Sequence, residues 1–158
     1  MELKIQSKPM DKWDARFVEL SKYVSDWSKD PNAKVGAVVV AKRGGATSLG
    51  YNGFPIGVED TAERLTDSEI KLELIVHAEQ NAIISAGPKT EGATIFVWGK
   101  PVCAKCAGAI IQAGIKRVVA ISPDTVDKGS KWHKTGVLSL KMFEEAHVTV
   151  DFYTFSDT

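Results

Sequence analysis

Cysteine, net charge and long apolar runs are all scarce in this sequence of 158 residues. Only two cysteines occur, Cys103 and Cys106, which excludes a disulfide-rich secreted fold. Twenty Lys and Arg balance twenty Asp and Glu, so no overall basic field exists to hold long nucleic acid through its phosphates. No apolar run approaches the ~20 residues of a membrane-spanning helix, and the N-terminal residues lack the apolar core of a signal peptide. We therefore expect a cytoplasmic protein with no nucleic-acid or membrane partner.

What is present is the composition of an ordinary globular domain, 44% hydrophobic and 25% charged. A chain of this length buries one sizeable hydrophobic core, and division into two domains would leave each domain with too small a core. The sequence shows no internal repeat, linker or low-complexity tract. It therefore predicts a single domain over residues 1–158.

Hydrophobic periodicity and turn residues predict the elements of the first half. A helix begins at Met10 or Asp11, followed by a buried strand at 35–40, a turn, and a second strand at 47–51. A Thr-x-x-Glu capping box at 66–69 starts a helix that we expect to continue past His77 to residue 86. Five apolar residues recur at steps of four, three, four and three along the first helix: Trp13, Phe17, Leu20, Val24 and Trp27.

Helices and strands alternate in the second half of the chain. The pattern predicts strands at 94–97, 117–121 and 148–152 and helices at 104–113 and 138–146, with a long polar loop before the last helix. That last helix is a crossover of the kind a parallel pair requires, so strands four and five should be parallel. The predicted fold class is α/β, a three-layer α/β/α sandwich around a mixed five-stranded sheet.

His77, Cys103 and Cys106 are residue types that bind metals. Each has a plainer interpretation alone, as a core histidine, a redox pair or two small buried hydrophobes. Together they offer three of the four ligands of tetrahedral zinc and leave a position for water, as in catalytic sites. In the first turn of a helix, Glu79 would stand beside that water as general acid and base. A solvated helix charge is the alternative for Glu79.

At this point the sequence resembles a known family. His-x-Glu followed by Pro-Cys-x-x-Cys is the signature of zinc nucleobase deaminases, although here Val102 stands between Pro101 and Cys103. Over roughly residues 11–152 the chain resembles the cytidine deaminase-like superfamily and, within it, the deoxycytidylate (dCMP) deaminases. Further motifs carry this resemblance, at 28–37, 50–57, 77–83 and 110–115.

The resemblance implies zinc-dependent hydrolysis of dCMP to dUMP and ammonia, which supplies dUMP for thymidylate synthesis. The zinc ligands would be His77, Cys103 and Cys106, one ion per chain. Glu79 would move protons from the attacking water to N3 of cytosine and to the leaving amino group. The backbone N–H of Ala78 would hold the pyrimidine carbonyl, with ordinary helix-end capping as the alternative.

Four side chains are candidates for selecting the substrate. Asn52 lies in a glycine-flanked loop and offers its amide to a sugar hydroxyl, although Asn-Gly is also a common turn. Ser28 and Lys29 suit a monophosphate, although alone they would end a helix with a favourable cation. Trp132 would cover the base or ribose, unless it packs onto its own domain.

The family resemblance also implies regulation through assembly. The dCMP deaminases are commonly homo-oligomers, often hexamers, activated by dCTP and inhibited by dTTP. We expect these effectors at Gly50, Tyr51, Asn52 and Gly53, with Mg²⁺ accompanying a triphosphate by charge. A strand-ending turn is the plain alternative for this loop.

Three other functions stay open. A free cytidine deaminase shares the metal and Glu79 but usually lacks the helix between strands four and five. A tRNA or DNA base deaminase must hold a polyanion, which zero net charge disfavours. A zinc-stabilised binding module has no use for a carboxylate beside its water. The sequence also does not separate dCMP from CMP or dCTP.

Overall fold

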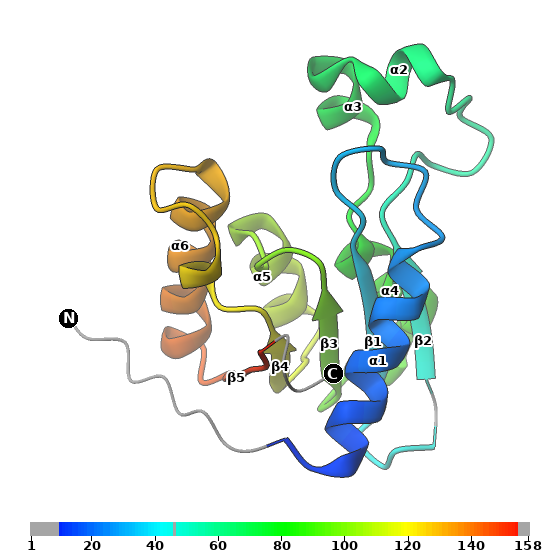
Figure 1. The fold of residues 1–158 in the computed structure, drawn as a ribbon. Coiled ribbons are helices and arrows are strands. Elements are labelled where there is room, and N and C mark those ends of the chain that lie inside the picture. Colours follow the sequence, from blue (N-terminus) through cyan, green and yellow to red (C-terminus); the bar gives the residue numbers. More distant parts are fainter. Residues whose placement is uncertain (1–9, 46, 155–158) are drawn as a thin grey trace.

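The computed structural model describes residues 10–45 and 47–154 (Figure 1). In chain order its elements are α1 (Lys12–Ser25), β1 (Gly36–Val40), β2 (Thr47–Tyr51), α2 (Ala62–Thr66), α3 (Ser68–Leu74), α4 (Ala78–Ala86), the 3₁₀ turn η1 (Gly87–Thr90), β3 (Thr94–Trp98), α5 (Ala104–Gln112), β4 (Arg117–Ala120), the 3₁₀ turn η2 (Pro123–Thr125), α6 (Lys131–Glu145) and β5 (Thr149–Phe152). Among the described residues, no helix is long and apolar enough to cross a bilayer.

The five strands form one mixed sheet in the order β2-β1-β3-β4-β5. β1 is antiparallel to both of its neighbours, whereas β3, β4 and β5 run parallel. Helices α5 and α6 make the two crossovers that the parallel pairs need. The predicted mixed sheet, with strands four and five parallel, is confirmed.

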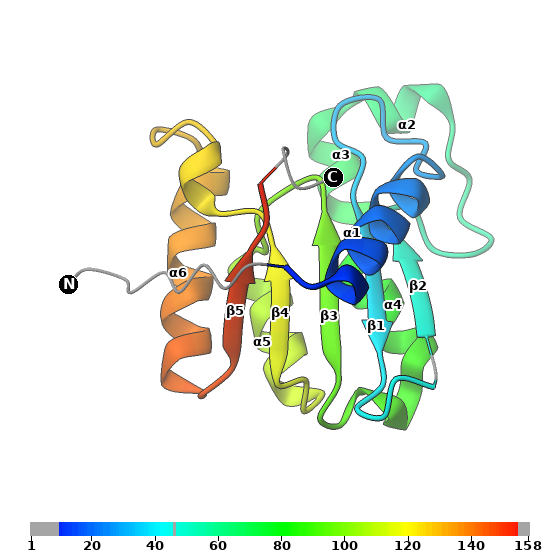
Figure 2. The same cartoon turned by 60° about the horizontal axis from the view of Figure 1, so that its bottom comes forward.

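Helices cover both faces of the sheet, which confirms the predicted three layers. Figure 2 shows α1 in front of the sheet and α4 and α5 behind it. β1 is buried on both faces because alternate side chains point to opposite sides. Val38 joins the core beneath α1, and Val39 joins the larger core beneath α4, α5 and α6.

The first helix begins as predicted, and the predicted apolar stripe is confirmed in part: Val24 is fully buried, and Phe17 and Leu20 pack against the core beneath α1. The Asp11 carboxylate accepts hydrogen bonds from the first turn of α1. Trp13 and Trp27, however, are 55% and 48% exposed, while Ser21 is fully buried. The physical reason is close packing on β1, where a Cβ on Gly36 would collide with the Ser21 carbonyl. The helix therefore buries Val18, Ser21 and Val24, whereas Trp13 is exposed and Trp27 lies beyond the last helical residue.

The predicted continuous helix from 66 to 86 is wrong, because two helices, α3 and α4, fill this range after the short helix α2. Asp67, and not Thr66, caps α3. Residues 75–77 are extended, and Val76 exchanges two backbone hydrogen bonds with Gly53, of 2.8 and 3.1 Å. This bridge to a distant loop ends the helix and leaves His77 at the start of a new one.

The last helix begins at Lys131 and not at residue 138 as predicted. Ser130 caps it by accepting a hydrogen bond from the His133 N–H. The first turns are polar, and Gly136 is buried at a point where a Cβ would meet Pro123. Trp132 therefore lies on the first turn of α6 and not on a loop.

Candidate active site

Two helix N-termini bring the three predicted ligands together. His77 is the residue before α4, Cys103 is the residue before α5, and Cys106 lies in the first turn of α5. The Nδ1 atom of His77 lies 3.2 Å from Sγ of Cys106 and 3.6 Å from Sγ of Cys103. The three ligand atoms all lie within 4.8 Å of one another. This spacing is compact enough for one metal ion to contact all three.

The chemistry of this donor set fits zinc. Two sulfurs and one imidazole nitrogen are the soft ligands that zinc takes in tetrahedral sites, and a set of three leaves one position open. A hydrogen bond from the Cys106 side chain lowers the pKa of Cys103 to about 4. The pKa of Cys106 is raised, because its thiol donates that bond and is buried. Zinc binds cysteine as the thiolate, so metal binding here would release thiol protons.

Glu79 lies in the first turn of α4, beside the ligand set. Its side chain is buried, with 4% of the residue exposed, and it lines the same cavity as His77 and Cys103. Burial raises the pKa of this carboxyl group, because removal from water disfavours its charged form. A carboxyl group held in this way is suited to accepting and returning a proton.

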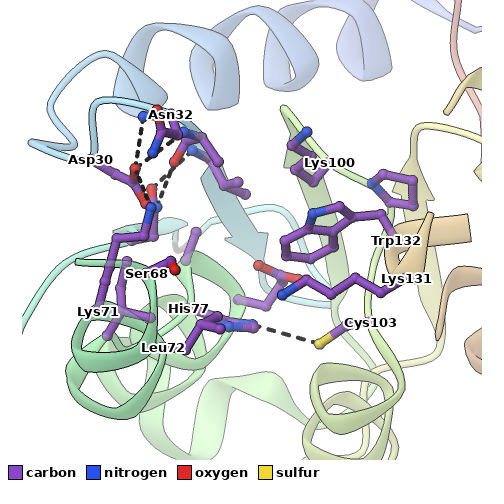
Figure 3. Close-up of a pocket in the computed structure, with 17 residues that line it drawn as sticks. Asp30, Asn32, Ser68, Lys71, Leu72, His77, Lys100, Cys103, Lys131 and Trp132 are labelled. Atoms are coloured by element: carbon purple, nitrogen blue, oxygen red, sulfur yellow. Dashed lines mark hydrogen bonds and ion pairs between the residues drawn. The ribbon is translucent and has the colours of Figure 1, made fainter. Parts of the chain in front are cut away.

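A cavity of about 240 Å³ opens onto these groups. His77, Glu79 and Cys103 lie at one end of it, as Figure 3 shows for the two labelled ligands. Its side walls come from five separate parts of the chain: the loop 30–35, Asn52, α3 with Ile75, the segment around Lys100 and the segment around Trp132. The arrangement is that of a small-molecule site, a concave cavity in which apolar walls carry several polar and charged side chains.

Three of the predicted substrate residues line this cavity. Ala78 is buried at the start of α4. The Asn52 amide accepts a hydrogen bond from Val35 N–H at 2.9 Å and donates one to Ala33 O at 2.7 Å. It therefore fixes the loop that forms one wall.

Trp132 lines the cavity on another side. The ammonium groups of Lys100 and Lys131 each lie 5.7 Å from the centroid of its ring. Cations at this distance from an indole are attracted to its face. The tryptophan is thus held between two lysines at the cavity edge.

Ser28 and Lys29 are not among the residues that line the cavity. Ser28 is buried and donates its hydroxyl hydrogen to Asn52 O at 2.8 Å. Lys29 is exposed and pairs with Asp60 at 2.7 Å. The phosphate role that the sequence assigns to them stays a prediction, and the cavity contains other cations.

The four residues assigned to effectors occupy different environments. Gly50 is buried beneath α4, where a Cβ would overlap backbone atoms of Ala78 and Ala82. The Asn52 amide is occupied by hydrogen bonds to the backbone, and Gly53 pairs with the segment before His77. Tyr51 is 42% exposed. Effector binding at this loop stays a prediction.

The sequence reasoning missed Asp30 and Lys71, which form a buried ion pair of 3.1 Å in the cavity wall. Asp30 belongs to an Asp-Pro-Asn turn, and Lys71 has the pattern of a solvated helix charge. Since the two residues are 41 positions apart, no local spacing indicates that they meet. The position of Lys100 in the cavity wall was also missed, because no local pattern indicates it.

The fold and the ligand set define a zinc deaminase class, and comparison with known proteins agrees. Residues 11–122 match the family model of the cytidine and deoxycytidylate deaminase zinc-binding region. The chain belongs to this family. An uncharacterized deaminase of the luxG 3′ region of Aliivibrio fischeri is 41% identical over 141 residues, covering 89% of this chain and 93% of that protein.

Human deoxycytidylate deaminase is 37% identical over 118 residues, which are 70% of this chain and 65% of the human protein. The match thus spans slightly less than two thirds of that relative. Among solved structures, the dCMP deaminase of cyanophage S-TIM5 in complex with dCMP and dUMP superposes with a TM-score of 0.68 at 23% identity. The match covers 94% of this chain and all of that one, and it confirms the cytidine deaminase-like fold.

Proposed function

We propose that this protein hydrolyses dCMP to dUMP and ammonia, and so supplies dUMP for thymidylate synthesis. One observation carries the proposal: His77, Cys103 and Cys106 converge beside the buried carboxyl group of Glu79 at the end of a small-molecule cavity. A binding module stabilised by zinc has no need of that carboxyl group. The human relative that is named a deoxycytidylate deaminase supports the choice of dCMP.

His77, Cys103 and Cys106 would hold one zinc ion per chain. When bound, zinc supplies a Lewis acid and lowers the pKa of a water molecule in the remaining position. Glu79 would take one proton from the water and pass it to N3 of the cytosine ring as the water oxygen bonds to C4. It would then carry the remaining proton of that oxygen to the amino group, so that the C4–N bond breaks, ammonia leaves and the C4 carbonyl of uracil remains. One carboxyl group acts in turn as base and acid, for which its buried position is suited.

The neighbouring groups orient the base and sugar. The N–H of Ala78 lies at the open N-terminus of α4 and holds the pyrimidine carbonyl. Asn52 faces the sugar from the wall of the cavity, and the Trp132 ring covers the base or ribose. Both residues line the cavity that holds Glu79.

The test of substrate is a panel of dCMP, CMP, dCTP, deoxycytidine and cytidine, each followed to its uracil product with zinc-loaded protein. We expect the highest kcat/KM for dCMP. A higher value for CMP, dCTP or a nucleoside would contradict the assigned substrate. Absence of turnover with all five would leave a binding module as the better interpretation.

The test of the metal site is Cys106→Ala, followed by metal analysis of the purified protein. We expect the parent to carry one zinc ion per chain and the variant to lose it, because two ligands hold zinc far less tightly than three. A variant that retains stoichiometric zinc would rule out this ligand assignment.

Regulation is the finer part of the proposal. We propose that the protein is a cytoplasmic homo-oligomer, as the dCMP deaminases it resembles commonly are, often as hexamers. We propose further that dCTP with Mg²⁺ activates it and that dTTP inhibits it, both through the loop at Gly50, Tyr51, Asn52 and Gly53. This loop contains Asn52, which lines the cavity, and its Gly53 pairs with the segment before His77. An effector that prefers one arrangement of the loop would therefore alter substrate affinity. Rates should be sigmoidal in dCMP and hyperbolic with dCTP. Hyperbolic rates that neither nucleotide changes, or a monomer by light scattering, would contradict this.

A further inference from the structure

We propose that Lys71 binds the 5′-phosphate of the nucleotide and that Asp30 is the positioning residue that holds its side chain. This inference rests on the proposed function, because it assigns the part of the site that recognises a nucleotide rather than a nucleoside. It concerns α3, a helix to which no role in the site was assigned from the sequence. Figure 1 shows α2 and α3 together beyond one end of β1 and β2.

The burial of Lys71 is the opposite of what folding alone favours. It is the one buried residue of α3, while its neighbours Ile70 and Leu72 are 43% and 51% exposed. Removing an ammonium group from water has a free-energy cost, and a buried ion pair seldom stabilises more than apolar residues of similar size. An inward apolar side chain would attach α3 at lower cost. A role in binding explains why a lysine stands here.

Asp30 orients this lysine without using all of its donors. The Oδ1 atom of Asp30 accepts from Lys71 Nζ at 3.1 Å and from the N–H groups of Asn32 and Ala33 at 2.9 and 3.2 Å. The negative charge of Asp30 is therefore shared with a backbone turn. An ammonium group has three N–H donors, and among the described residues Asp30 is its one acceptor. Two donors remain for an anion in the cavity that Lys71 lines.

The position of Lys71 agrees with the order of groups along a nucleotide. The cytosine ring must reach Glu79, and Asn52 lines the same cavity as Asp30 and Lys71 and is hydrogen-bonded to Ala33 and Val35 in the loop that contains Asp30. Figure 3 shows Lys71 extending from α3 to Asp30 on the side of the cavity opposite Trp132. A base at Glu79 with its sugar near Asn52 therefore directs the phosphate toward Lys71.

The other cavity lysines have a different environment. Lys100 and Lys131 lie over the Trp132 ring, where their charges add to the aromatic cover of the base. Lys29 pairs with Asp60 outside the cavity. Of these cations, Lys71 is the one that is buried and fixed by a partner that also lines the cavity.

The experiment measures kcat/KM for dCMP and for deoxycytidine in Lys71→Met, with Lys116→Met, a change of an exposed lysine, as control. Losing a hydrogen bond to a charged group should lower kcat/KM for dCMP by about 10- to 100-fold, with deoxycytidine changed less than about threefold. Lys71→Arg, which retains the charge, should recover most of the preference for dCMP. Lys71→Met leaves the Asp30 carboxylate without its cation. The double variant Asp30→Asn/Lys71→Met removes that unpaired charge and keeps a side-chain oxygen at position 30 that accepts from the backbone turn.

Calorimetric binding of dUMP and of deoxyuridine separates this inference from the proposed reaction. If no cytosine compound is deaminated but Lys71→Met weakens dUMP binding and spares deoxyuridine, the reaction is wrong and the phosphate assignment stands. Equal losses for nucleotide and nucleoside would show a purely structural lysine and overturn the inference. It is also overturned if the preference for the nucleotide survives in Lys71→Met and disappears in Lys29→Met or Lys131→Met.

Discussion

Glu79 is a carboxyl group that the fold keeps almost out of water, and this position defines its chemistry. We predict that Glu79→Gln retains the fold and the zinc but lowers kcat by about 10²–10⁴, the usual contribution of acid and base catalysis. The amide is nearly isosteric with the carboxyl group, so packing is preserved. The measurement is kcat on dCMP together with metal content and the unfolding midpoint.

The matched control for this prediction is Glu144→Gln, an exposed glutamate of α6, which should leave kcat unchanged. If Glu79→Gln with full zinc turns over at a rate near that of the parent, the proposed proton transfers are wrong.

At the scale of residues, chemical type and local spacing made the ligands predictable. Two residues separate Cys103 from Cys106, and one residue separates His77 from Glu79, so these groups were recognisable before their distances were known. The pair of Asp30 and Lys71 was not, because a contact between distant parts of the chain leaves no local pattern.

Gly50 determines how closely α4 approaches the sheet, and α4 positions Glu79 and begins just after His77. A Cβ at Gly50 would overlap backbone atoms of α4, and a helix backbone cannot yield as a flexible side chain can. We predict that Gly50→Ala lowers the free energy of unfolding by about 1–3 kcal/mol, the usual cost of overpacking, and also lowers kcat. Urea unfolding and dCMP kinetics measure the two effects.

Gly53→Ala is the control, since a Cβ there meets nothing within 4 Å. We expect little change in its stability. If both alanine variants destabilise equally, backbone freedom of the loop matters more than the packing of α4, and close packing is not the reason for a glycine at position 50.

At the scale of elements, hydrophobic periodicity predicted which segments form strands and which form helices better than it predicted where each element begins and ends. The break before α4 depends on hydrogen bonds between Val76 and Gly53, and the buried face of α1 depends on Gly36 in another element. Both are tertiary effects that override a local preference. Ser130 is a residue type that commonly caps helices. The first turn of α6 after it is polar, however, so no apolar periodicity indicated that the helix begins there.

The whole molecule should depend on its metal for part of its stability. The ligands join the starts of α4 and α5, and the metal binds the folded chain far more tightly than the unfolded one. With free zinc at about 100 times Kd the gain is about 2.7 kcal/mol, which for a chain of this size is roughly 5–11 °C in Tm.

The measurement compares thermal unfolding of loaded protein, chelator-treated protein and protein to which zinc is restored. We expect Tm to fall on chelation and to recover with zinc. Identical Tm values in all three samples would mean that His77, Cys103 and Cys106 do not hold a metal that matters to the fold.

The architecture of the whole molecule was predictable because topology rules leave few arrangements for alternating helices and strands. The crossover by α6 predicted the parallel pair of β4 and β5 correctly. The cavity was not predictable, since its walls come from parts of the chain that meet only in the finished fold.

The groups proposed to bind zinc and transfer protons all lie between His77 and Cys106, on one consecutive unit of α4, β3 and α5. Most of the cavity walls that would distinguish one nucleotide from another come from other parts of the chain: the loop 30–35, Asn52, α3 with Ile75 and the start of α6. The groups proposed to react thus lie on one consecutive unit, and most of the groups proposed to select the substrate lie on other segments. Replacing α3 by a helix of different sequence should change which cytosine compound the protein accepts and leave the reaction itself unchanged.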